Sequence, residues 1–196
     1  MSDIFTRSRP TDFQLREDGG DMFIEGYFVV FNHPYYMDEY CEEYVAPDAF
    51  DGCEMDDVRA LIDHRTDMVL GRTTSNTLTL NIDDTGLFAS VKINPADTDA
   101  VNLHARVQRG DVNQASFGFD EREVVYTDLA DGRVRREITG IAKLYEVSVC
   151  TFPAYEGTYV TARSANGAAE KIRGELLARK KEKLKRRFKH HGNQNA

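Results

Sequence analysis

The sequence lacks the features of a secreted or membrane-bound protein. It has no apolar run of the ~18 residues that a membrane helix needs, and its first residues, MSDIFTRSRPTDF, lack the apolar core of a secretory signal. Its three cysteines, Cys41, Cys53 and Cys150, are odd in number and widely scattered, which favours reduced thiols over a disulfide framework or a zinc site. We therefore expect a soluble, cytoplasmic protein without disulfides, metals or organic cofactors.

The chain is rich in charge, but the two signs are unevenly distributed. From Arg163 onward there are 11 Lys/Arg and 3 Asp/Glu, a net charge of +8, whereas residues 1–162 hold 14 basic and 30 acidic side chains, a net charge of −16. An acidic body repels nucleic acid, so any polyanion contact would have to come from the tail. We predict one domain over residues 1–162 and a basic helical tail over residues 163–196.

Short runs rich in Val, Ile, Phe, Tyr and Thr, separated by Gly, Asn and Asp, predict a strand-rich body whose consecutive strands pair in antiparallel fashion. The expected strands are 22–31, 58–62, 77–82, 87–93, 114–119, 121–127, 133–138 and 141–151. Apolar residues at helical spacing, closed by Gly110, predict one helix over Thr98–Arg109. A second helix, with an apolar stripe among basic residues, is expected over 168–188, after a linker at 164–167.

Four phrases follow one another along the chain: YVAPDAF at 44–50, LIDHRTDMVLGR at 61–72, ASFGF at 115–119 and LYEVSVCTFPAY at 144–155. A turn into a strand, Asp84 to Leu87, adds a fifth. In this order and spacing the set resembles the tailed-phage prohead serine proteases, which mature viral capsids. The resemblance covers about three quarters of the chain and leaves out the basic tail.

The resemblance implies a fold and a set of catalytic residues. The family's fold is similar to that of the herpesvirus capsid maturation proteases, the assemblins, so we expect an α+β protein with a small, mostly antiparallel β-barrel flanked by helices. Carried over phrase by phrase, Ser116 is the nucleophile, His64 the general base and Glu146 the acid. Herpesvirus relatives have a second histidine in place of the acid, so Glu146 departs from the wider group.

The chemistry requires these residue types on separate grounds. A serine hydroxyl attacks poorly until an imidazole accepts its proton, and a carboxylate can hold that ring in one tautomer. Strand alternation puts Ser116 on one face with Gln114 and Gly118, where a glycine leaves space for a substrate backbone. Backbone amides near Phe152 to Gly157 are the expected oxyanion donors.

Other interpretations of the same residues stay open. Ser116 is also compatible with an ordinary half-buried strand serine, and Ser148 is a rival serine on the face of Glu146. His104 lies on the apolar side of the expected helix, as core histidines do. Asp63 and Asp67 flank His64 and could replace Glu146 as the orienting acid. Cys150 could be a nucleophile, but its apolar surroundings favour a buried thiol.

The sequence therefore predicts a serine endopeptidase that acts in the host bacterial cytoplasm, inside an assembling procapsid. By resemblance, its substrates are the scaffolding protein or the scaffold-like N-terminal segment of the major capsid protein, and finally itself, with self-cleavage near 162–167 releasing the tail. We expect possible self-association, as in the herpesvirus relatives, and neither membrane nor nucleic-acid partners. The alternative is a non-catalytic assembly factor that binds scaffold or capsid with the same fold.

Overall fold

The structure, a computed structural model, describes residues 5–36, 40–152, 172, 174–182 and 185. The chain separates into two compact units, Phe5–Tyr159 and a second unit of residues 1–4 with 160–196. Within the second unit, residues 172, 174–182 and 185 are helical. The expected linker at 164–167 lies outside the described residues, so the boundary at 162 stays a prediction. No helix in the described part is long and apolar enough to cross a membrane.

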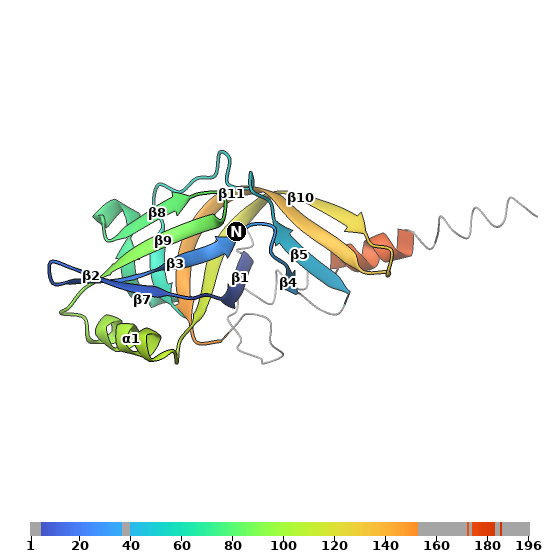
Figure 1. Ribbon diagram of the computed structural model, residues 1–196. Helices are drawn as coiled ribbons and strands as arrows, with labels where there is room; N and C mark the ends of the chain where they lie inside the picture. The colour runs from blue at the N-terminus through green and yellow to red at the C-terminus, as the bar shows by residue number, and fades with distance from the viewer. Residues whose placement is uncertain (1–4, 37–39, 153–171, 173, 183–184, 186–196) are drawn as a thin grey trace, which may run out of the picture. The chain divides into compact units, whose positions relative to one another are not determined.

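The first unit is built from two β-sheets (Figure 1). The seven-stranded sheet has the order β1-β10-β11-β5-β4, with β6 paired to β11 and β7 paired to β6. Its strands are β1 (Phe5–Pro10), β4 (Tyr35–Tyr36), β5 (Cys41–Val45), β6 (Arg59–Ile62), β7 (Arg65–Arg72), β10 (Gln114–Asp128) and β11 (Val134–Cys150). The four-stranded sheet has the order β2-β3-β9-β8, from β2 (Gln14–Asp18), β3 (Asp21–Val30), β9 (Gly86–Ile93) and β8 (Leu78–Ile82).

This arrangement confirms a sheet-dominated protein with few helices and corrects the predicted barrel. Among the described residues no strand ladder joins one sheet to the other, so both sheets stay open and no closed barrel forms. The predicted antiparallel pairing of consecutive strands holds for β8 with β9 and for β10 with β11, and β2, which lies outside the predicted strands, also pairs with β3 in this way. However, β5 and β6 both run parallel to β11, a pairing between segments far apart in the sequence.

Two long strands span the seven-stranded sheet. The sequence predicts a break near Asp120 and another near Gly140, but β10 and β11 each continue through these points. Register shifts between Gly118 and Val124 let the ladder bend without ending, as β-bulges do. One half of this ribbon pairs with β1 and β6, and the other half lies beside β5 (Figure 1).

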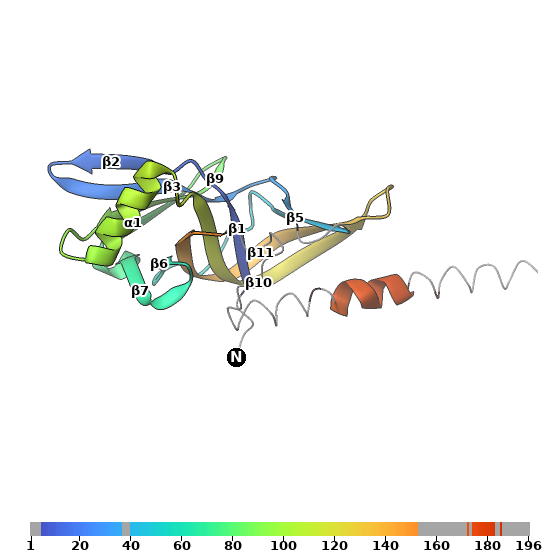
Figure 2. The ribbon, with the colours of Figure 1, turned by 90° about the horizontal axis from the view of Figure 1, so that it is seen from below.

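The helix and the core follow local sequence signals. Helix α1 (Thr98–Arg109) has the predicted bounds, because the Asp97 side chain accepts hydrogen bonds from the first helical amides and Gly110 ends the helix with a φ of 83°. A short 3-10 helix, η1 (Thr73–Ser75), follows β7. In both views α1 lies near β2 and β7 (Figure 2). Alternate residues of β9, such as Val91, and the continuous buried run 114–119 of β10, which includes Phe117, supply the core.

A buried group of charges ties β1 to the rest of its sheet. Arg7 pairs with Glu43 of β5, which also pairs with Arg136 of β11, and Arg136 pairs with Glu121 of β10. Arg7, Glu43 and Arg136 are each at most 1% exposed. Burial alone would raise the pKa of Glu43, but the two guanidinium groups outweigh it and lower that pKa. Because removal of one partner would leave a buried charge unpaired, these pairs tie β1 to β5 and, through Glu43 and Arg136, to β11 and β10.

Candidate active site

His64 lies in the two-residue turn that joins β6 to β7. Asp63 and His64 have φ values of 49° and 59°, and Ile62 pairs directly with Arg65. Two consecutive residues with positive φ are characteristic of a type I′ hairpin turn, which matches the twist of its strands. Asp and His enter this left-handed region more readily than most residues, although at an energetic cost. The turn therefore needs other contacts to hold the imidazole in place.

Those contacts come from the end of β11. The Asp63 carboxylate accepts hydrogen bonds from the Thr151 amide at 2.7 Å and the Thr151 hydroxyl at 3.1 Å. The Asp63 amide donates to the Val149 carbonyl at 3.1 Å, and the His64 amide donates to the Ser148 hydroxyl at 3.3 Å. The turn is thus fastened to three positions at and just beyond the end of β11: Ser148, Val149 and Thr151.

Glu146, also on β11, contacts the His64 ring. Its Oε1 lies 2.8 Å from His64 Nδ1, and its Oε2 accepts a hydrogen bond from the Ser148 hydroxyl. An ionised carboxylate only accepts hydrogen bonds, so Nδ1 carries the proton and Nε2 is left as the basic nitrogen. Burial lowers the pKa of His64, but the hydrogen bond to Glu146 and the charges of Glu146 and Asp63 outweigh it, so that pKa is raised.

Ser116 lies one strand away from this pair. In the β10–β11 ladder it is directly opposite Ser148, and on its other side it is opposite Ser8 of β1. Directly opposed residues have Cβ atoms about 4.5–5.5 Å apart on the same face of the sheet, so Ser116 shares a face with Ser148 and Glu146. Ser116 is fully buried, and its Oγ has no hydrogen-bond partner in the described part of the chain.

Gly118 faces Glu146, its direct partner in the ladder. A Cβ built on Gly118 would lie 3.1 Å from Cδ and 3.2 Å from Cγ of Glu146, and closer still to Oε1. The sequence predicts that this glycine makes room for a substrate backbone, whereas the structure fills that space with the Glu146 side chain. The glycine in this phrase is therefore what allows the carboxylate to lie against the strand of Ser116.

The other two carboxylates near His64 have different partners. Asp63 binds Thr151, and Asp67 forms an exposed ion pair with Arg65 at 2.8 Å. Of the three acids that the sequence leaves open, Glu146 is the one that accepts a hydrogen bond from the imidazole among the described contacts.

Residues 11–171 match the caudovirus prohead serine protease family. The chain belongs to this family. It is 30% identical to the prohead protease of Enterobacteria phage HK97 over 167 residues, which cover 83% of this chain and 69% of that protein. Among solved structures, the bacteriophage T4 capsid assembly protease, gp21, is similar with a TM-score of 0.43 and 8% identity, over 74% of this chain and 96% of that one.

Membership of the prohead protease family confirms the resemblance drawn from the four phrases and gives the chain a role as a capsid maturation protease. All four phrases lie within the matched residues 11–171. The likeness to the herpesvirus proteases stays a prediction, as do the roles of the individual site residues.

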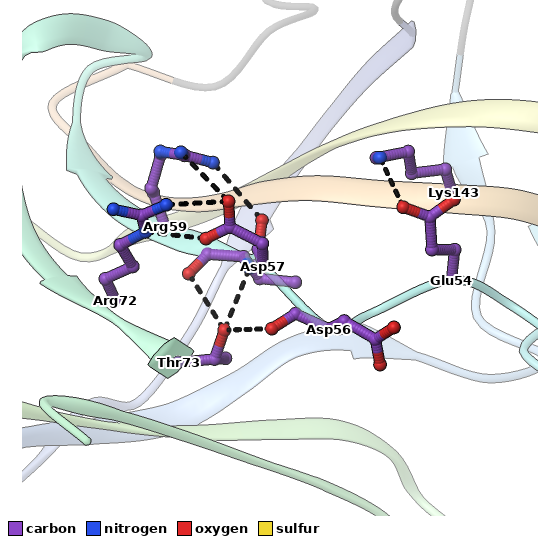
Figure 3. Close-up of polar contacts among 8 residues, drawn as sticks. Glu54, Asp56, Asp57, Arg59, Arg72, Thr73 and Lys143 are labelled. Atoms are coloured by element: carbon purple, nitrogen blue, oxygen red, sulfur yellow. Dashed lines mark hydrogen bonds and ion pairs between the residues drawn. The ribbon is translucent and has the colours of Figure 1, made fainter. Parts of the chain in front are cut away.

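Arg72, the last residue of the second phrase, forms an ion pair with Asp57 (Figure 3). Arg72 binds Asp57 at 2.6 and 2.8 Å, and Asp57 also binds Arg59 at 3.1 Å. The hydrogen bond from Arg72 lowers the pKa of Asp57 to about 2. Arg59 is the β6 partner of Glu146 in the parallel ladder, so this ion pair fixes the strand beside the acid. Nearby, Thr73 donates to the Asp56 carbonyl and Lys143 pairs with Glu54 (Figure 3).

The rival residues take positions that suit packing. His104 is 7% exposed on α1 beside the core, and its Nε2 has no described hydrogen-bond partner. Cys150 is 2% exposed, and burial raises the pKa of its thiol well above the usual range, so it is not a ready nucleophile. The described residues contain no cluster of His, Cys, Asp and Glu that could hold a metal ion. Of the expected oxyanion donors at Phe152 to Gly157, Phe152 is described and exposed, and 153–157 lie outside the described residues.

Proposed function

We propose that this chain is a serine endopeptidase in which Ser116 is the nucleophile, His64 the general base and Glu146 the residue that orients the base. The proposal rests above all on the 2.8 Å contact between His64 Nδ1 and Glu146 Oε1, on the same sheet face as a serine whose hydroxyl is free of described partners. A nucleophile, its base and an orienting acid are the three parts that acyl transfer to serine requires.

The proposed reaction assigns one step to each group. His64 Nε2 takes the proton of Ser116 Oγ as that oxygen bonds to the scissile carbonyl carbon, and the imidazolium then protonates the leaving amine. Water, deprotonated by the same nitrogen, releases the acyl group from Ser116. Glu146 keeps the proton of Nδ1 in place and stabilises the imidazolium throughout. Because the base must be neutral to start, activity rises with pH through the raised pKa of His64.

Burial of Ser116 adds a condition to this proposal. The residue has no exposed surface, so a peptide carbonyl can reach its Oγ only after the surroundings of the site open. We therefore expect slow turnover by the isolated chain and faster turnover in the presence of its procapsid components.

The substrates follow from the family role. We propose that the enzyme cleaves the scaffolding protein, or the scaffold-like N-terminal segment of the major capsid protein, and also its own chain near residues 162–167, inside the assembling procapsid of an infected cell. The tail at 163–196, with a net charge of +8 on an otherwise acidic chain, would dock the enzyme on scaffold before it is removed. Deletion of the tail should then reduce incorporation into procapsids.

The test compares the full-length chain with Ser116→Ala, each alone and each coexpressed with the scaffolding and major capsid proteins of its phage. Intact mass spectrometry should show truncation of the chain and of a capsid component only where Ser116 is present. If all proteins keep their full mass in every combination, the chain is the non-catalytic assembly factor instead.

A further inference from the structure

The Ser148 side chain makes two hydrogen bonds, one to the proposed orienting acid, Glu146, and one to the proposed base, His64. Its hydroxyl donates to Glu146 Oε2 and accepts from the His64 amide at 3.3 Å. A serine hydroxyl has one proton to donate, and here that proton is directed at the carboxylate. Ser148 is fully buried, so bulk water cannot take the place of either partner of its hydroxyl while the site is closed. Its hydroxyl is occupied, whereas that of Ser116 is not.

Both partners of Ser148 need outside contacts: Glu146 to fix the direction of its carboxylate, and His64 to hold its backbone conformation. The last torsion of a glutamate side chain is broad, so the direction of the Glu146 carboxylate depends on what binds its two oxygens. His64 has a φ of 59°, which needs support from contacts outside the turn. One hydroxyl therefore restrains the acid through its side chain and the base through its main chain.

We propose that Ser148 is a positioning residue that locks Glu146 and the His64 turn into one unit. The inference rests on the proposed function, because it takes His64 to be the base, but it concerns a residue that touches no substrate in that mechanism. It also assigns a role to the rival serine of the sequence: Ser148 serves the site without attacking the peptide.

The locked unit has a consequence that packing alone would not produce. Glu146 and Asp63 are the charged groups that raise the pKa of His64. Without the Ser148 hydroxyl, Oε2 becomes a buried acceptor without a partner, and the carboxylate turns away to find another donor. The imidazolium then loses its nearest negative charge, and Ser148→Ala should lower the pKa of His64. Ser148→Thr keeps a hydroxyl at this position and should preserve that pKa.

The first measurement needs no catalysis. In full-length Ser116→Ala, the titration of the His64 ring is followed by NMR, with its signal assigned from its loss in His64→Gln. Adding Ser148→Ala should shift the titration to lower pH, and adding Ser148→Thr should restore it. Ser8→Ala is the matched control, since Ser8 is the other direct neighbour of Ser116 in the sheet. An unchanged or higher His64 pKa in Ser148→Ala overturns the proposal.

The second measurement uses active protein with Ser116 in place. The first-order rate of self-cleavage should fall about 10–100-fold in Ser148→Ala and recover in Ser148→Thr, because a misplaced acid no longer orients the base. A wild-type rate in Ser148→Ala contradicts the positioning role, even if the pKa has moved. If the wild-type chain itself cleaves nothing, the proposed function is what fails, and the NMR titration still decides whether Ser148 locks the pair.

Discussion

Replacing Gly118 with alanine should separate catalysis from folding. The added Cβ would lie 3.1 Å from Cδ of Glu146, nearer than ordinary van der Waals contact, and closer still to the oxygen that binds His64. The side chain of Glu146 must then move by about 0.5–1 Å to restore normal contact distances. From the present 2.8 Å, a shift of that size takes the bond to His64 Nδ1 past the usual limit of about 3.2 Å.

The two effects of Gly118→Ala differ in size. Loss of a hydrogen bond to a charged group costs about 1.5–3 kcal/mol, which corresponds to roughly 10–150-fold in rate if the bond acts in the transition state. Overpacking costs about 1–3 kcal/mol in a rigid core. Here the crowded atoms belong to the flexible end of a side chain, so we expect a loss of stability near the lower limit, or a shift of about 2–4 °C in Tm.

The assay measures the rate of self-cleavage by intact mass and the Tm of the same variant in the Ser116→Ala background. Gly140→Ala is the control, because its Cβ would meet the flexible end of Arg122 at 2.9 Å, away from the site. We expect wild-type cleavage from that control. A wild-type rate in Gly118→Ala would refute the reasoning, since it would mean that the position of the Glu146 carboxylate has little influence on the base.

Four further outcomes are expected. Asp63→Asn keeps an acceptor for the Thr151 amide and should cleave almost normally, whereas Asp63→Ala should lose about tenfold or more in rate. Glu43→Leu leaves two buried guanidinium groups without their shared partner and should lower the free energy of unfolding by roughly 3–5 kcal/mol in urea titrations. Because the folded pKa of His64 is raised, its stabilisation is complete below about pH 6.5 and is lost as the pH rises through the folded pKa. The unfolding free energy of Ser116→Ala should therefore exceed that of Ser116→Ala with His64→Gln by less at pH 8 than at pH 5.5. Native protein should resist alkylation of Cys150 by iodoacetamide at pH 8, and cleavage should continue in its presence.

The parts of the fold that the sequence predicts well are those fixed by local signals. Helix α1 has the expected bounds because Asp97 caps its start and Gly110 supplies the positive φ at its end. Strand β8 and strand β9 lie within a residue of their predicted limits, since a turn at Asp83–Gly86 joins them. In these segments the cap or turn residue and the apolar pattern point to the same structure.

The parts that the sequence misses depend on contacts between distant segments. The sequence does not predict strand β1, because FTRSRP is short and its buried Arg7 gains its closest ion-pair partner only when the distant strand β5 supplies Glu43. The parallel pairing of β5 and β6 with β11 likewise has no local signal. Among the described residues both sheets stay open, where the resemblance implies a barrel.

The candidate site shows the same division. The residue types came from the four phrases, but their relation comes from register: Ser116 opposite Ser148, and Gly118 opposite Glu146. A slip of one residue between β10 and β11 would turn one of these sets to the other face and separate the serine from the acid. The register shifts in this ladder all lie between Gly118 and Val124, so the pairs from Gln114 to Gly118, which include the site residues, keep a regular register.

Two features of this region lower the stability of the fold. The turn that carries His64 and the hydroxyl of Ser116 each cost free energy, the first through positive φ and the second through a buried oxygen without a described partner. The bonds from Asp63 and Ser148 to neighbouring groups offset part of the first cost. For the second, no described bond compensates, and the hydrogen bond from Ser116 Oγ to His64 Nε2 that the proposed mechanism needs is not among the described contacts. Under the proposed function, this bond forms when the site opens to substrate, and the free energy lost at Ser116 in the closed fold is a cost in stability that serves the chemistry.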